Sequence, residues 1–245
     1  MDYFNKFLFN AIPTVLLELL AALAGFYFLK KNRNASKYDK YFVVFLWYTF
    51  ANEVIGAYAP IAYFSEYRIF GFIKGTLFER NYWLYNIYFI INASFLVYYF
   101  NNLLSNKKSR KITNFVLWSY VLSAIIFLFA TDVYYKSYSN FTFALGAILL
   151  LISILLFYFR LLKTDEIIDL KKYLPIYLSI GVMFFYLCVT PIELFAKYFK
   201  ITNEVYVAIR INLLLICNIF MYTTFIIGFI VCAKDKPNKE KRITK

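Results

Sequence analysis

The stretch FTFALGAILLLISILLFYFRLL, residues 141–162, decides the fold of this chain. It carries a single charge, Arg160, close to its end. About 20 apolar residues in a helix that rises 1.5 Å per residue cross a hydrocarbon core of roughly 30 Å. A strand of a membrane barrel would instead alternate apolar and polar residues over about ten positions. Residues 147–158 do not alternate, so the stretch is predicted to be a transmembrane helix.

Six further stretches have the same character: residues 8–29, 41–64, 83–104, 112–131, 173–199 and 207–232. Hydrophobic residues make up 62% of the chain and the mean hydropathy is +0.60, which excludes a typical soluble domain. We predict an all-α, polytopic membrane protein, with a bundle of seven transmembrane helices at residues 1–232 and a basic tail at residues 233–245. The first segment should remain in the mature protein, because its apolar run is too long for a cleaved signal peptide.

The basic residues indicate an orientation. Nineteen of the 27 Lys and Arg residues lie in the connections after the first, third and fifth segments, in the tail or, for Arg160, in the last turn of the fifth segment. Because short loops rich in Lys and Arg stay in the cytoplasm, the N-terminus is predicted outside and the C-terminus inside. This asymmetry also accounts for the net charge of +13, so we expect the lipid bilayer as a partner and no nucleic acid. The tail is either an orientation signal alone or also a contact with anionic lipid.

Several kinds of chemistry are missing from the sequence. The chain has no histidine, and its three cysteines lack Cys-x-x-Cys spacing. No nucleotide-binding loop, zinc-protease helix or serine elbow is present. We therefore expect no cofactor, no metal and no enzymatic activity. An intramembrane enzyme is the third choice of function, because only Glu18 and Glu53 could act as acid or base at depth.

Glu18 and Glu53 fall near the midplane of the first and second segments, where an ionisable residue is costly. Each lies on a helical face of small and polar residues, so both carboxyl groups are predicted to point into the bundle. If they meet, at least one is expected to be protonated near neutral pH, which makes a shared or mobile proton one reading. The other is purely structural: two neutral acids hydrogen-bonded to the backbone or to Asn52 and Asn92.

A second pair of charges lies nearer the outside. Glu193 in the sixth segment and Arg210 in the seventh fall in the outer third of antiparallel neighbours, which predicts an ion pair. Snorkelling of Arg210 to the outer interface is the alternative. Tyr186 shares the helical face of Glu193, while Asn92 and Asn218 fall nearer the middle of the membrane. The predicted site residues could outline a polar cavity in the middle and outer half, beneath the loop at 65–82: Glu18, Asn52, Glu53, Asn92, Tyr186, Glu193, Arg210 and Asn218. That loop is predicted either as an amphipathic lid or as an irregular aromatic loop.

A weak internal repeat links the first and last three segments. Two motifs recur 131 residues apart: Phe26, Tyr27 and Phe28 with Phe157, Tyr158 and Phe159, and Pro60, Ile61, Phe64 and Tyr67 with Pro191, Ile192, Phe195 and Tyr198. Asn86 and Asn92 recur 126 residues later as Asn212 and Asn218. An arrangement of three helices, one helix and three helices resembles the SWEET and PQ-loop transporters. That resemblance implies a central solute site with Asn92 and Asn218, although the Pro-Gln pair of that group is absent.

The stretches NYWLYNIYFI at 81–90 and YLPIYLSIGVMFFY at 173–186 also resemble uncharacterised seven-helix proteins of the bacterial inner membrane. Two classes of function remain. In the first, the protein is a sensor or signalling subunit whose outward-facing cavity binds a small-molecule ligand and whose cytoplasmic loops and tail contact a signalling partner. In the second, it is a small-solute or proton-coupled transporter. The first is favoured because helix-breaking glycines are scarce, the inner half offers no charged path, and the compact seven-helix form carries no catalytic groups.

Overall fold

The computed structural model describes residues 2–163, 171–195 and 204–234. Within these ranges the secondary structure is helical, without strands: α1 (Asp2–Lys31), α2 (Lys37–Gly56), α3 (Tyr58–Phe64), the short 3-10 helix η1 (Gly71–Ile73), α4 (Tyr82–Asn102), α5 (Lys107–Ala130), α6 (Val133–Lys136), α7 (Asn140–Leu162), α8 (Leu174–Phe195) and α9 (Glu204–Lys234). Seven helical stretches are long and apolar enough to cross a membrane. This confirms the all-α prediction and the presence of seven helical stretches with the length and apolar character of membrane spans. Residues 196–199 of the sixth predicted segment and the tail from residue 235 lie outside the described residues.

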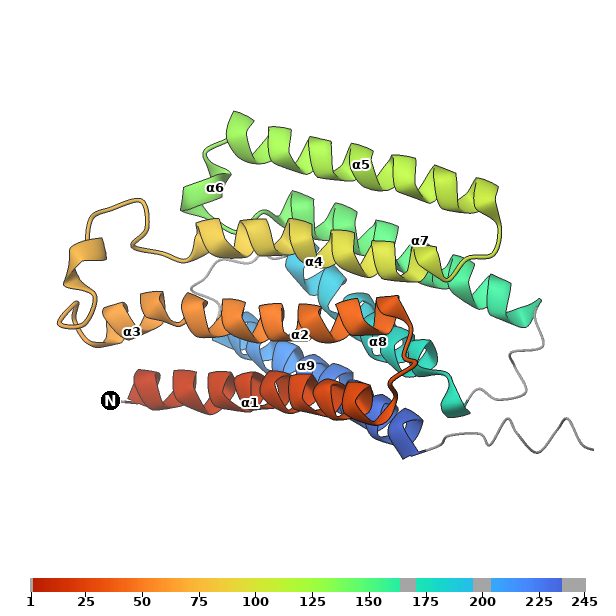
Figure 1. Ribbon diagram of the computed structural model, residues 1–245. Coiled ribbons are helices and arrows are strands. Elements are labelled where there is room, and N and C mark those ends of the chain that lie inside the picture. The colour runs from red at the N-terminus through yellow and green to blue at the C-terminus, as the bar shows by residue number, and fades with distance from the viewer. Residues whose placement is uncertain (1, 164–170, 196–203, 235–245) are drawn as a thin grey trace, which may run out of the picture.

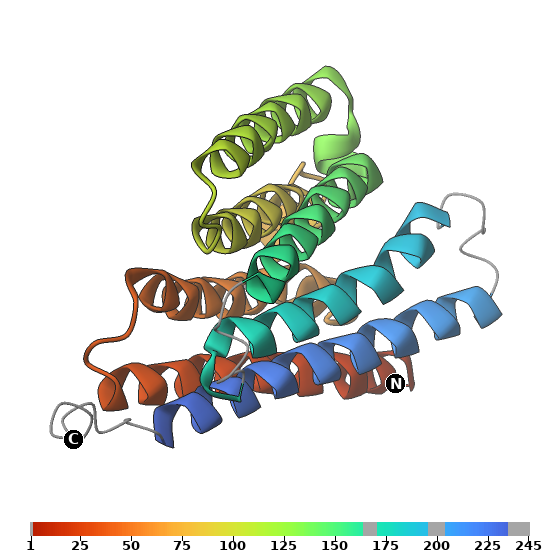
Figure 2. The same ribbon diagram turned by 90° about the vertical axis from the view of Figure 1, so that its right-hand side faces the viewer.

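Six of the long helices form a ring in chain order, and α5 lies outside it. Helix α1 packs on α2 and α9, α4 packs on α2 and α7, and α8 packs on α7 and α9. Among the long helices, α5 packs substantially only on α4 and α7, against their outer sides. Figures 1 and 2 show α5 set apart from the other helices. Its outward side chains are among the most exposed of the molecule, including Phe115, Trp118 and Phe129. Such side chains suit lipid.

The two ends of the bundle differ (Figure 1). We call the end formed by the C-terminal ends of α1, α4, α7 and α9 the basic end, because most of the Lys and Arg residues lie there in the sequence. The opposite end carries α3, residues 65–81 and α6, and we call it the loop end. At both ends short polar side chains begin the helices by capping free backbone N–H groups. At the basic end Ser36 accepts from the N–H of Asp39 at 3.1 Å, and at the loop end Ser139 accepts from that of Thr142 at 3.2 Å.

The segment predicted as one helix at 41–64 is broken at Ala57, between α2 and α3. Pro60 lacks an N–H and cannot donate to the carbonyl of Gly56, one helical turn earlier. That carbonyl instead accepts a hydrogen bond from Nδ2 of Asn81, at 2.9 Å. The break is therefore stabilised by the residue that precedes α4, far away in sequence.

Residues 65–81 form an irregular loop rather than an amphipathic helix. Glu66, Tyr67 and Phe70 have positive φ angles, which non-glycine residues rarely adopt. The carboxylate of Glu79 stabilises the loop by accepting from the Tyr67 hydroxyl at 2.5 Å and from the N–H of Gly75 at 3.0 Å. These hydrogen bonds lower the pKa of Glu79 and contribute to raising that of Tyr67.

A continuous layer of buried aromatic rings crosses the half of the bundle nearer the basic end. It connects α1, α2, α4, α7 and α9, and neighbouring ring centroids lie 5.2 to 6.3 Å apart. We call this set the aromatic layer: Phe28, Phe42, Tyr99, Phe100, Phe157 and Phe229. Each of these side chains is at most 6% exposed. Aromatic rings pack densely at such separations, and the layer fills the interior of the ring at this depth together with the buried Leu174 and Leu178 of α8.

Candidate functional site

A cavity of about 370 Å³ lies inside the ring, between the aromatic layer and the loop end. Helices α1, α2, α4, α7, α8 and α9 line it together with Tyr138 from the turn before α7, whereas α5 contributes no lining residue. Apolar side chains form its floor, among them Leu46, Leu96 and Phe225, and Phe42 belongs to both the floor and the aromatic layer. A cavity bordered by most of the predicted site residues is therefore present in the fold, in the half of the bundle nearer the loop end.

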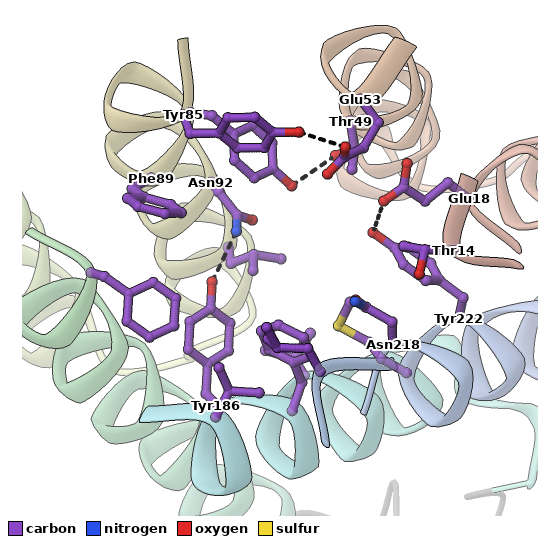
Figure 3. A pocket seen from close by; sticks show the side chains of 18 of the residues that line it. Thr14, Glu18, Thr49, Glu53, Tyr85, Phe89, Asn92, Tyr186, Asn218 and Tyr222 are labelled. Atoms are coloured by element: carbon purple, nitrogen blue, oxygen red, sulfur yellow. Dashed lines mark hydrogen bonds between the residues drawn. The ribbon is translucent and has the colours of Figure 1, made fainter. Parts of the chain in front are cut away.

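Glu18 reaches this cavity from α1 and is 3% exposed. Its Oε1 accepts a hydrogen bond from the Tyr222 hydroxyl of α9, at 2.9 Å. Its Oε2 is buried and has no hydrogen-bond partner among the described residues. Figure 3 shows this second oxygen pointing away from Tyr222, on the side of the cavity where Glu53 lies.

Glu53 lines the same cavity from α2, which agrees with the prediction that two carboxyl groups point into the bundle. Its Oε2 accepts from the Tyr85 hydroxyl of α4, at 2.6 Å. The hydrogen-bond partners of the two glutamates are thus tyrosines, and the predicted partners Asn52 and Asn92 were wrong. Asn52 is buried but does not line the cavity, because adjacent residues on a helix point about 100° apart and Glu53 occupies the inward direction.

The two central asparagines both line the cavity, as predicted. Asn92 of α4 donates from Nδ2 to the hydroxyl of Tyr186 on α8, at 2.9 Å, and this bond connects the two sides of the ring (Figure 3). Asn218 projects into the cavity from α9 (Figure 3). Tyr186, which the sequence placed on the face of Glu193, is therefore both a lining residue and the partner of Asn92.

Glu193 and Arg210 form the predicted ion pair near the loop end. Nε of Arg210 donates to Oε1 of Glu193 at 2.8 Å, and a terminal guanidinium nitrogen donates to Oε2 at 3.1 Å. Such a bidentate pair fixes both side chains, and the alternative of Arg210 snorkelling alone is wrong. Asn140 at the start of α7 donates to the Glu193 carbonyl at 3.0 Å, so three helices meet at this corner.

Aromatic side chains form much of the walls, and sequence reasoning identified only Tyr186 among them. The rings of Phe89 and Phe143 lie 5.4 Å apart, and Phe143 stacks on Tyr186 at 5.7 Å. On α4, Tyr85, Phe89 and Asn92 are spaced by four and three residues, which predicts that they share one face of the helix. The chain contains 24 Tyr and 29 Phe residues, and in the other segments they occur on every face of the predicted helices. The sequence therefore did not distinguish the aromatic residues that face inward from those that face outward.

Two further observations concern the loop and the internal repeat. Residues of the loop at 65–81 do not line the cavity; with α3 this loop instead encloses a separate pocket of about 300 Å³ that Tyr138 borders. The asparagines of the internal repeat also differ in environment. Asn86 is completely buried, whereas Asn212 is exposed. Both halves of the chain nevertheless contribute Asn92 and Asn218 to one cavity.

Within the described part of the chain, no three residues of the metal-binding types gather into a cluster that could hold an ion. The described lining residues of the cavity offer carboxyl groups, amides, phenol hydroxyls and aromatic faces. This set of groups suits the reversible binding of a small organic molecule. Protein-family models, curated proteins and solved structures were compared with the chain, and none matched.

Proposed function

We propose that this protein is a multi-pass membrane sensor or signalling subunit whose cavity binds a small molecule that enters from the loop end. The observation that carries the proposal is the combination of a polar cavity in one half of the ring with the aromatic layer in the other. A ligand in such a site can bind and leave on one side without passing through. In this proposal the loop end faces outward and the basic end faces the cytoplasm, in accord with the charge asymmetry of the sequence.

Helices α8 and α9 are the natural elements to transmit binding. Among the described helices, α8 and α9 have the most extensive contact with each other. They also carry Tyr186, Asn218 and Tyr222, which line the cavity. Two glycines allow their close approach: a Cβ atom on Gly181 would lie 2.3 Å from Oγ1 of Thr224, and one on Gly228 would lie 2.5 Å from Cβ of Tyr177. A pair packed this tightly is expected to move as one body, so that a shift at the cavity reaches the basic end and a cytoplasmic partner.

A small-solute or proton-coupled transporter is the second candidate. Two observations favour it. Three helices before α5 and three helices after it line the cavity, and the two acidic residues Glu18 and Glu53 are both among the lining residues. This resembles the arrangement of three, one and three helices in the SWEET and PQ-loop transporters. In such a mechanism the aromatic layer would open in a second conformation.

One experiment separates the two functions. The full chain in lipid nanodiscs is first screened for thermal stabilisation by a broad library of small metabolites, because a ligand at 100 times its Kd stabilises by about 2.7 kcal/mol. Each stabilising compound is then tested for accumulation in proteoliposomes, with Glu53→Gln as the control. The sensor proposal predicts binding without accumulation. Accumulation that requires Glu53 would favour transport, and a screen without any stabilising compound would contradict both.

A further inference from the structure

Acidic side chains outnumber basic ones among the described residues that line the cavity. Arg210 is the only cationic side chain among the described lining residues, and its guanidinium group is held by the carboxylate of Glu193 in a bidentate pair. Two acidic groups, Glu18 and Glu53, then remain without a basic partner among those residues. An anionic ligand would find no free basic partner among these residues, whereas a cationic ligand would supply the counter-charge that favours the ionised form of the two carboxyl groups.

Glu18 adds a geometric requirement. Its Oε1 is occupied by the Tyr222 hydroxyl, while Oε2 is buried at the cavity without a partner among the described residues (Figure 3). A buried acceptor of this kind normally has a donor. Since the surrounding side chains supply none, the missing donor is best provided by a ligand with an N–H or O–H group. A quaternary ammonium carries charge but cannot donate.

The remaining wall suits the other part of such a ligand. Tyr85, Tyr88, Phe89, Phe143 and Tyr186 present aromatic rings to the cavity. Aromatic faces attract ammonium groups and also pack against apolar or aromatic bodies. The cavity volume of about 370 Å³ is near the lower end of small-molecule sites, which span roughly 300 to 1,000 Å³.

We propose that the ligand is a small protonated primary or secondary amine with an apolar or aromatic body. Its ammonium group donates to Oε2 of Glu18 and is further attracted by Glu53, while its body packs against the aromatic wall. This inference deepens the proposed function and rests on it, because it names the chemical class that the cavity selects.

Four matched probes test the ligand class on the full chain in nanodiscs, by calorimetry and by thermal stabilisation. They are 2-phenylethylamine, its neutral analogue 2-phenylethanol, the donor-free cation trimethyl(2-phenylethyl)ammonium, and the anion phenylacetate. We expect the primary amine to bind at least about tenfold more tightly than each of the others, which corresponds to one charge-assisted hydrogen bond. Equal binding of the amine and the alcohol, or no binding of the amine at millimolar concentration, would overturn the proposal.

Variants assign the binding to the proposed groups. Glu18→Gln should weaken binding of the amine at least about tenfold and leave binding of 2-phenylethanol unchanged. Glu53→Gln should also weaken binding of the amine, but by a smaller factor. Glu66→Gln is the matched control, because Glu66 is exposed on the loop at 65–81 and lines neither pocket. Amine binding that survives both cavity variants would overturn the proposal. Tight binding of a neutral or anionic compound at this cavity would overturn the ligand class alone, whereas the proposed function fails separately if no compound of the broad library binds.

Discussion

Asn86 connects α4 to the turn that precedes α7, and we expect its replacement to destabilise the protein strongly. Its side chain is completely buried, and Nδ2 donates to the carbonyls of Ser137 at 2.9 Å and Tyr134 at 3.1 Å, with a longer bond to Val133 at 3.4 Å. Its Oδ1 accepts from the N–H of Ser139 at 2.8 Å. The turn that Asn86 holds also positions two lining residues of the cavity, so its loss should affect the site as well.

The magnitude follows from these bonds. Asn86→Leu removes all of them and leaves the buried N–H of Ser139 without its acceptor, which alone costs about 1–3 kcal/mol. The Val133 carbonyl keeps a bond from the N–H of Ser137, at 3.1 Å, and should add little. The two remaining carbonyls lie in more exposed residues and add about 1 kcal/mol together. We expect a total of about 2–4 kcal/mol. Asn86→Asp should be no milder, because an oxygen would then face the carbonyls.

Thermal unfolding in detergent measures the effect. A loss of about 3 kcal/mol corresponds to a Tm lower by roughly 6–12 °C for a chain of this size. The control is Asn212→Ala, the residue paired with Asn86 by the internal repeat, which is exposed and should change stability by less than about 0.5 kcal/mol. Equal effects of the Asn86 and Asn212 variants would refute this reasoning.

Three further predictions concern other parts of the fold. Gly181→Ala should cost about 1–3 kcal/mol, because its Cβ would lie 3.0 Å from a backbone oxygen of α9, whereas Gly71→Ala has nothing within 4 Å and should be neutral in the same unfolding assay. Glu193→Gln should cost about 1–3 kcal/mol by leaving Arg210 without its counterion, and adding Arg210→Gln should recover part of the loss; strictly additive effects in this double-mutant cycle would contradict the ion pair. The pKa of Glu79 is lowered in the folded protein, so its hydrogen bonds stabilise the loop at 65–81 fully at a pH above the ordinary pKa of 4.5. This stabilisation is lost as the pH falls through the lower pKa of the folded state. Protease cleavage of the loop should therefore increase below pH 4.5 in the native protein and be independent of pH in Glu79→Gln.

The fold could be predicted because each membrane span is a local property of about 20 residues, and no knowledge of distant contacts is required. The break at Ala57 could not, because it depends on the amide of Asn81 as well as on Pro60. Local sequence also placed the ends of the spans to within a few residues. The exact ends depend on capping side chains such as Ser36.

The candidate site was predicted in part for a similar reason. Ionisable groups within a membrane are costly, so Glu18, Glu53 and the Glu193–Arg210 pair could be recognised by depth alone. Their partners depend on which helices become neighbours, and the tyrosines that bind both glutamates come from α9 and α4. Asn52 was assigned wrongly because its depth was right but its direction on the helix was not.

The most direct test of the account is the reactivity of cysteines placed along the interior of the ring. Cys188, Cys217 and Cys232 are first replaced by Ala, and Asn218→Cys and Phe100→Cys are then made in this background. Each variant is treated with a membrane-impermeant, cationic thiol reagent, in whole cells and in inside-out vesicles.

We predict that the cysteine at position 218 reacts from outside the cell and not from the cytoplasmic side, and that the cysteine at position 100, in the aromatic layer, reacts from neither. That pattern would support both the orientation and a cavity that is closed toward the basic end. An unreactive cysteine at position 218, or reaction at position 100 from the cytoplasmic side, would contradict the account.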